Sequence, residues 1–341
     1  MLELSELWFI LIAVLFIGFV FLEGFDFGVG MQLKFLAKND LERRMLINSI
    51  GPFWDANEVW LLTAGGAMFA AFPHWYATLF SGYYLAFFLM LLALIARGVA
   101  FEYRSKVEDK RWRTIWDWCI ILGSLLPPFL LGALFSGLAK GLPINETKTM
   151  HAAFFGDIVN LYTVVGGITF VMVVYMHGLN FSQLKLAGEM RDRANQQALK
   201  MFIPTAAVVV LYVILTAVYT GVFGEGKAML TIPIWALAIL LYLAMYPLLK
   251  KRREGLSFAV TGVILVLVVA SYFVALFPYV LVSTIDPAYS ITVHDAASGP
   301  YTLKAMTIVA LCLVPVVLAY TIWAYYMFRK RVTPDEEQMT Y

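Results

Sequence analysis

The sequence carries little charge. Of its 341 residues only 14% are charged, whereas 61% are apolar. Soluble domains contain about 25% charged residues, so this composition excludes an ordinary soluble protein and indicates an integral membrane protein. The net charge is only +2, and the basic residues occur as short runs between apolar segments. This pattern gives no support for binding to nucleic acid.

Apolar runs of about 20 residues predict helices that span a membrane. We expect nine such spans in a single polytopic domain with an all-α fold. Their approximate ranges are 8–30, 52–72, 78–96, 114–136, 155–177, 202–222, 231–249, 256–282 and 305–328. The first run is too long for a signal peptide, and no small-residue cleavage site follows it, so we keep it as the first span.

The basic residues predict the orientation of the chain. All but four of the 25 Lys and Arg residues fall in alternate loops, and Arg97 is assigned to one of these basic loops. The four exceptions are Lys140, Lys148, Lys227 and Lys304. Because basic loops face the cytoplasm, the N-terminus should lie outside and the C-terminus in the cytoplasm. With nine spans, nearly all basic residues fall in loops on one side of the membrane, which supports that number of spans.

Four carboxylates lie within the first two predicted spans. Glu23 and Asp26 fall near the end of the first span, and Asp55 and Glu58 open the second, three residues apart in each pair. Ionisable side chains inside a membrane are costly and usually functional. The two spans are antiparallel neighbours joined by a short loop. Both pairs should therefore lie on the order of 5–10 Å inside the cytoplasmic surface, given about 1.5 Å per helical residue.

Two interpretations of these carboxylates remain open. The functional one is a proton entrance from the cytoplasm, because carboxylates held close together can share and pass on protons. In the structural one, Asp55 only caps a helix and Glu58 extends to the membrane surface. For Asp55 alone the two are equally supported. For the whole cluster we favour the functional one, because four acids with few nearby bases require compensation.

Cysteine and histidine are too sparse for a cofactor site. Cys119 and Cys312 are far apart within apolar spans, so they form no metal-binding or disulfide pattern. A haem in a membrane protein needs axial ligands such as His or Met. The four histidines lie at span ends or in a loop, with no two at one depth: His74, His151, His177 and His294. We expect no metal site and no haem ligated by this chain alone.

Several linked motifs carry a specific resemblance. They are EGFDFGVG at 23–30, LERRMLINSI at 41–50, WDANEVWLLTAGG at 54–66, EYRSK at 102–106, RWRTIWDW at 111–118 and GSLLPP at 123–128, with a looser match at 290–297. In these motifs the sequence resembles subunit II of cytochrome bd-type quinol oxidases. The motifs are dense up to residue 128, and the rest of the chain agrees in its pattern of spans.

The resemblance implies a heterodimer with a haem-bearing subunit I of similar nine-helix fold. Each subunit would comprise two four-helix bundles plus one peripheral helix. The complex would oxidise quinol near the outer face of the bacterial cytoplasmic membrane and reduce O2 to water. Two b-type haems and one haem d would be ligated by subunit I. Some relatives contain a bound structural quinone or lipid and a very small third subunit, and the sequence leaves both open.

The resemblance also assigns residues to a proton route. Asp55, in the Trp-Asp-x-Asn segment, would lie on the route towards the haems, and Asp26 is a second candidate acid. Glu58 stands where some members have a neutral Gln, which leaves its role less defined, and Glu23 is included with these residues in the proton route.

Two other functions use the same residues. A proton- or cation-coupled secondary transporter would bind its substrate near the membrane midplane, between broken helices. Pro127-Pro128 is the only strong candidate for such a break. A purely structural scaffold would instead make the carboxylates dispensable.

Overall fold

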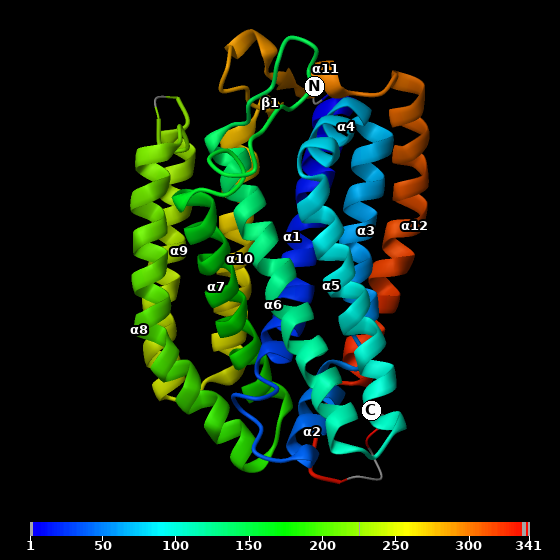
Figure 1. The fold of residues 1–341 in the computed structure, drawn as a ribbon, viewed down its shortest axis with the longest axis vertical. Helices are drawn as coiled ribbons and strands as arrows, with labels where there is room; N and C mark the ends of the chain where they lie inside the picture. Colours follow the sequence, from blue (N-terminus) through cyan, green and yellow to red (C-terminus); the bar gives the residue numbers. More distant parts are fainter. Residues whose placement is uncertain (1–2, 225, 336–338, 340–341) are drawn as a thin grey trace.

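Long helices that run between the two ends of the molecule dominate the computed structural model (Figure 1). The structure describes residues 3–224, 226–335 and 339. Within them, eight helices are long and apolar enough to cross a membrane. They are α1 (Leu4–Met31), α5 (Tyr84–Tyr103), α6 (Lys110–Lys140), α7 (Leu161–Lys185), α8 (Gly188–Tyr219), α9 (Ala228–Lys250), α10 (Glu254–Leu276) and α12 (Pro300–Met327). The predicted class, an α-helical multi-pass membrane protein, is confirmed.

The span expected at 52–72 corresponds to α3 (Trp54–Ala71), which is not among these eight. Its first two turns contain Asp55, Asn57 and Glu58, and these polar side chains lower its mean hydropathy. α3 nevertheless packs against α1 and runs alongside it (Figure 1). The polar residues that make α3 a candidate for function are thus the same ones that lower its hydropathy below that of the eight helices.

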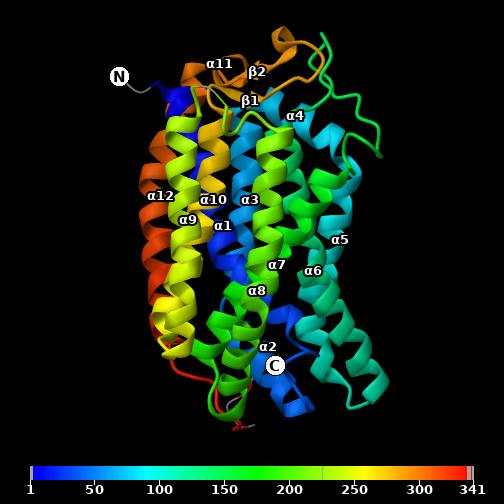
Figure 2. The same ribbon diagram turned by 90° about the vertical axis from the view of Figure 1, so that its left-hand side faces the viewer.

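Short elements close the two ends of the long helices. At one end, here the α2 end, lie α2 (Asp40–Ile50) and the 3-10 turn η1 (Arg104–Lys106). At the other, the α11 end, lie α4 (Pro73–Gly82), β1 (Tyr279–Leu281), η2 (Pro287–Tyr289), β2 (Ile291–Thr292) and α11 (Val293–Ala296) (Figure 2). The two strands pair antiparallel, with Tyr279 opposite Thr292. This ribbon is the one departure from helix that the all-α prediction did not include.

The structure differs from several predicted span boundaries. α7 covers 161–185 where a span at 155–177 was expected, and α8 begins at Gly188 where the predicted span begins at 202. Two further differences have clear physical reasons. The span expected at 256–282 ends at Leu276, because Pro278 cannot continue a helix and the preceding residue is extended. The span expected at 78–96 continues as α5 to Tyr103, so that Arg97 lies inside a helix rather than in a loop. A neutralising partner, described below, explains why this charge does not end the helix.

α1 is the central helix of the fold. It packs against α3, α6, α7 and α10. A Cβ atom on Gly28 of α1 would lie 2.3 Å from the carbonyl oxygen of Val174, and one on Gly178 of α7 would lie 2.4 Å from the Gly28 Cα. Glycine at both positions is therefore what lets the backbones of α1 and α7 touch. α12 stands at the edge of the molecule, where it contacts α1 and α3 (Figure 2).

Candidate functional site

A buried ion pair joins α1 to α5. The Arg97 guanidinium donates to Glu23, and both side chains are 0% exposed. The guanidinium also lies over the ring of Phe27, 4.6 Å from its centroid. A Cβ atom on Gly123 of α6 would lie 2.6 Å from the Arg97 Cβ, so only glycine leaves room for arginine here. Removing either partner of an ion pair in so apolar an environment strongly destabilises the folded protein, because the remaining charge stays buried without compensation.

α3 supplies the second carboxylate of this cluster. Glu58 lies 3.7 Å from the same Arg97 guanidinium, and its side chain is 21% exposed. Asp55, one turn earlier on α3, is exposed. Exposure thus decreases from Asp55 through Glu58 to Glu23, which is 0% exposed.

Asp26 belongs to a neighbouring hydrogen-bonded chain. Its side chain is fully buried and accepts a hydrogen bond from the Asn57 amide nitrogen, at 2.7 Å. The Asn57 amide oxygen in turn accepts from the Tyr325 hydroxyl of α12, at 2.9 Å. Three helices, α1, α3 and α12, therefore meet at this carboxylate.

Five buried polar atoms of this cluster have no hydrogen-bond partner among the described residues. They are Glu23 Oε2, Asp26 Oδ1, Glu58 Oε2, Arg97 Nε and Arg97 Nη1. Buried polar atoms are nearly always hydrogen-bonded, to protein or to ordered water. Each of these groups can form a hydrogen bond to an ordered water molecule.

The structure brings together three of the four predicted carboxylates, Glu23, Asp26 and Glu58, and places Asp55 on the exposed side of α3. Sequence reasoning missed Arg97 as a member of the cluster, because the basic-loop pattern assigned it to a loop. One signal was available: the apolar run resumes directly after it, at residues 98–101.

A second ionic cluster lies at the α2 end and has a structural role. Asp40 accepts hydrogen bonds from Arg104 at 2.6 Å and from Arg113 at 2.8 Å. Arg104 also donates to the buried Asp117, at 2.6 Å. Burial opposes ionisation of Asp40, but the hydrogen bond and charge of Arg104, with the charge of Arg113, outweigh it and lower the Asp40 pKa. The 102–106 and 111–118 motifs thus fasten α2 to α5 and α6.

Of the four histidines, one is buried and three are exposed. His177 is fully buried, and both ring nitrogens are engaged, with the Thr261 hydroxyl at 2.8 Å and the Phe21 carbonyl at 3.1 Å. His74, His151 and His294 are exposed. The described residues contain no group of three or more His, Cys, Asp or Glu that could hold a metal ion.

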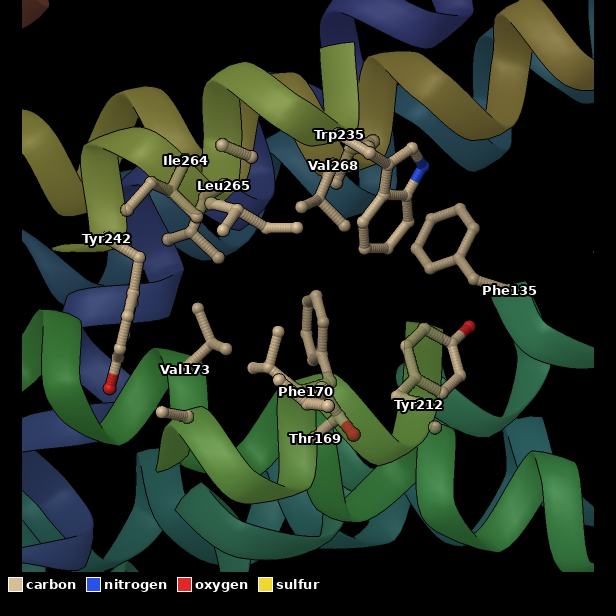
Figure 3. Close-up of a pocket in the computed structure, with 18 of the residues that line it drawn as sticks. Phe135, Thr169, Phe170, Val173, Tyr212, Trp235, Tyr242, Ile264, Leu265 and Val268 are labelled. Carbon is tan, nitrogen blue, oxygen red and sulfur yellow. The ribbon is translucent and has the colours of Figure 1, made fainter. Parts of the chain in front are cut away.

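A cavity of about 120 Å³ lies among α7, α8, α9 and α10 (Figure 3). Phe170, Trp235 and Leu265 are among its apolar lining residues. At one side, Tyr212 takes part in a chain of hydroxyl groups. The Tyr212 hydroxyl bonds to Ser136 at 2.8 Å, to Tyr162 at 3.3 Å and to Tyr272, and Tyr162 also bonds to Thr216 at 3.1 Å. The described residues that line this cavity include no Asp, Glu, His, Lys or Arg.

Together, the long apolar helices and the buried carboxylate–arginine cluster define a multi-pass membrane protein with titratable groups held inside it. A family model described as cytochrome bd terminal oxidase subunit II matches residues 4–328. The chain therefore belongs to the family of cytochrome bd terminal oxidase subunit II. The resemblance seen in the motifs is confirmed, and so is the predicted class of oxidoreductase subunit in a bacterial membrane.

Individual relatives agree over the full chain. The cytochrome bd ubiquinol oxidase subunit 2 of Bacillus subtilis is 49% identical over 341 residues, which cover all of both chains. The cytochrome bd-I ubiquinol oxidase subunit 2 of Escherichia coli is 37% identical, covering 98% of this chain and 96% of the relative. A chain in the structure of bd oxidase from Geobacillus thermodenitrificans matches with a TM-score of 0.78 at 15% identity, covering 96% and 99% of the two chains, which shows the shared fold.

The secondary-transporter alternative is not favoured. The family match argues against it, and so does the helix that was its candidate break. α6 continues through Pro127 and Pro128 as a helix from Lys110 to Lys140.

Proposed function

We propose that this chain acts as subunit II of a quinol oxidase that reduces O2 to water, and that it provides a proton route from the cytoplasm. Its partner would be a haem-bearing subunit I that ligates two haems b and one haem d. The names of the ubiquinol oxidase relatives support the substrate. The engaged ring nitrogens of the buried His177 support a location of the haems outside this chain.

The proposal includes nine spans, with α3 as the ninth. α1, α3, α5 and α6 would form one four-helix bundle, α7 to α10 the other, and α12 the peripheral helix. The packing of α1 on α3, of α5 on α6, and of α7 on α8 and α10 supports this division. The basic residues of the connections at the α2 end support a cytoplasmic location of that end and an outer location of the N-terminus.

The proposed route runs from Asp55 at the surface to Glu58, then to Glu23 beside Arg97, and on to Asp26. The decrease in exposure along this series gives it a direction, from water to the interior. The observation that carries the proposal is that three buried carboxylate oxygens of this cluster, on Glu23, Asp26 and Glu58, have no hydrogen-bond partner among the described residues. Each buried polar atom left unsatisfied costs about 1–3 kcal/mol, so water is expected at these atoms. Water at these atoms would connect the carboxylates.

The route is tested in the purified two-subunit complex reconstituted into vesicles. Asp26→Asn and Glu58→Gln each remove a group that can release a proton while keeping a similar shape. We expect oxygen consumption with a quinol donor to fall by about tenfold or more, since proton transfer by a positioned group is typically worth a factor of about 100 or more. The haem absorption spectrum should not change.

A matched control is Glu108→Gln, an exposed carboxylate at the α2 end. It should leave turnover unchanged. A pH-sensitive dye on the side of the α2 end should record slower proton uptake in the two route variants only. If both consume oxygen at the wild-type rate with intact spectra, the route does not pass through these residues.

A further inference from the structure

A crevice of about 810 Å³ separates α12 from the rest of the molecule near the α2 end, and we call it the α12 crevice. Aromatic and aliphatic side chains from α1, α10 and α12 line it, among them Phe21, Phe25, Phe258, Leu318 and Ile322. Its volume falls within the range of about 300–1,000 Å³ that is usual for ligand pockets. An apolar lining of this kind accommodates hydrocarbon chains.

α12 is attached to the body of the molecule close to its two ends. At the α11 end, the Trp8 indole nitrogen donates to the Leu303 carbonyl at 3.2 Å and to the Thr307 hydroxyl at 3.0 Å. At the α2 end, the Lys185 ammonium of α7 donates to the Phe328 carbonyl and to the Lys330 carbonyl. Little of α12 is buried in between. The crevice is therefore held at both ends by specific contacts.

Positive charge gathers where the crevice reaches the α2 end. Lys185, Arg329 and Arg331 all line it. Lys185 is only 7% exposed, and the partners of its ammonium are neutral carbonyls. Arg329 is exposed and lies 3.8 Å above the Tyr326 ring. Among the described residues, Glu254 is the carboxylate paired with Arg331, and it is shared with Arg191. Three basic side chains thus line the mouth of the crevice.

We propose that the α12 crevice binds one anionic glycerophospholipid. Its phosphate would lie at Lys185 and Arg329, and its acyl chains would lie along the apolar wall. A negatively charged headgroup complements the positive charge of the basic side chains that line the mouth. The acyl chains would fill the space between α12 and α1. This inference does not depend on the proposed proton route.

The test uses the purified oxidase complex after removal of its lipids by detergent exchange. Phosphatidylglycerol or phosphatidylcholine is added back, and native mass spectrometry counts the bound lipids at each concentration. We expect one site that binds phosphatidylglycerol at least about tenfold more tightly than phosphatidylcholine, since each basic residue near the headgroup contributes about 1 kcal/mol. Lys185→Gln with Arg329→Gln should remove that preference.

Two further variants separate charge from folding. Lys106→Gln with Arg111→Gln removes the same two charge types from exposed positions at the α2 end, and it should leave the site intact. Leu318→Trp adds volume to the crevice wall without changing charge, and it should weaken binding of both lipids. The haem spectrum of each variant verifies assembly. Equal affinity for the two lipids, equal loss in the control pair, or a tightly bound isoprenoid quinone that phosphatidylglycerol cannot displace would overturn the proposal.

Discussion

Two regions of this molecule bury polar groups in opposite ways. Around α1, α3 and α5, charged side chains are buried with five of their polar atoms lacking a hydrogen-bond partner among the described residues. Around α7 to α10, buried hydroxyl groups bond to one another beside an apolar cavity (Figure 3). In the second region the indole nitrogen of Trp235 also lacks a hydrogen-bond partner, so an unsatisfied atom alone does not identify a site. Among the described residues, the buried carboxylate oxygens without a hydrogen-bond partner all lie in the first region, and they distinguish it.

The largest expected effect comes from breaking the ion pair. Arg97→Leu leaves Glu23 buried without its cation, which should destabilise the complex by about 3–5 kcal/mol. Thermal unfolding of the purified complex, followed by circular dichroism, measures the loss.

Two controls accompany this experiment. Arg111→Leu removes an exposed arginine and should change the unfolding temperature little. The double variant Arg97→Leu with Glu23→Leu removes both charges, and it should recover part of the lost stability. If Arg97→Leu is no less stable than Arg111→Leu, the pair contributes nothing and the contrast between the two regions is wrong.

The sequence predicted part of this site because a charge within an apolar run is visible without a structure. Glu23, Asp26 and Glu58 were located in that way. The role of Arg97 was not predictable, because it depends on the packing of α5 against α6, where Gly123 makes room for it. The exposure of Asp55 also depends on tertiary packing, which leaves one face of α3 uncovered.

The hydroxyl chain of the other region could not be predicted from the sequence. Its members Ser136, Tyr162, Tyr212 and Tyr272 lie on four different helices, so no local spacing connects them. The order and class of the helices were predictable, since apolar runs determine them. The span predicted at 52–72 has a weaker signal, because the polar residues of α3 lower the hydropathy that marks the other helices.

The next prediction concerns Asn57, which connects Asp26 to Tyr325. Asn57→Leu has a similar shape but can donate no hydrogen bond to Asp26 and accept none from Tyr325. We expect a loss of about 1–3 kcal/mol in stability, because Asp26 remains fully buried and Tyr325 partly buried without this partner. A denaturant titration of the complex measures it. Asn57→Asp, which keeps an acceptor for Tyr325, separates the two bonds, and a wild-type midpoint for Asn57→Leu would contradict the prediction.

The hydroxyl chain provides the matched experiment in the second region. Tyr212→Phe removes the hydroxyl that bonds to Ser136, Tyr162 and Tyr272. The expected loss of stability is about 0.5–1.5 kcal/mol, because these partners are neutral. Oxygen consumption should stay at the wild-type level. A tenfold drop in turnover with normal stability would show that the hydroxyl groups of this region carry protons too. The contrast between the two regions would then be wrong.

The smallest effect is expected at Asp40, a partly exposed carboxylate that is paired with arginine, as Glu23 is. Its side chain is 34% exposed, so solvent screening should limit the cost of Asp40→Asn to less than about 1 kcal/mol at pH 7. Burial opposes the charged form, but Arg104 and Arg113 outweigh it, and the folded-state pKa lies below the unfolded value of about 3.9. The contribution is therefore complete above the unfolded pKa and is lost as the pH falls through the folded pKa. Unfolding temperatures of the wild type and Asp40→Asn should differ most at neutral pH and converge in acid. A gap that widens in acid would mean that Asp40 is stabilised as a neutral group, which its two arginine partners do not allow.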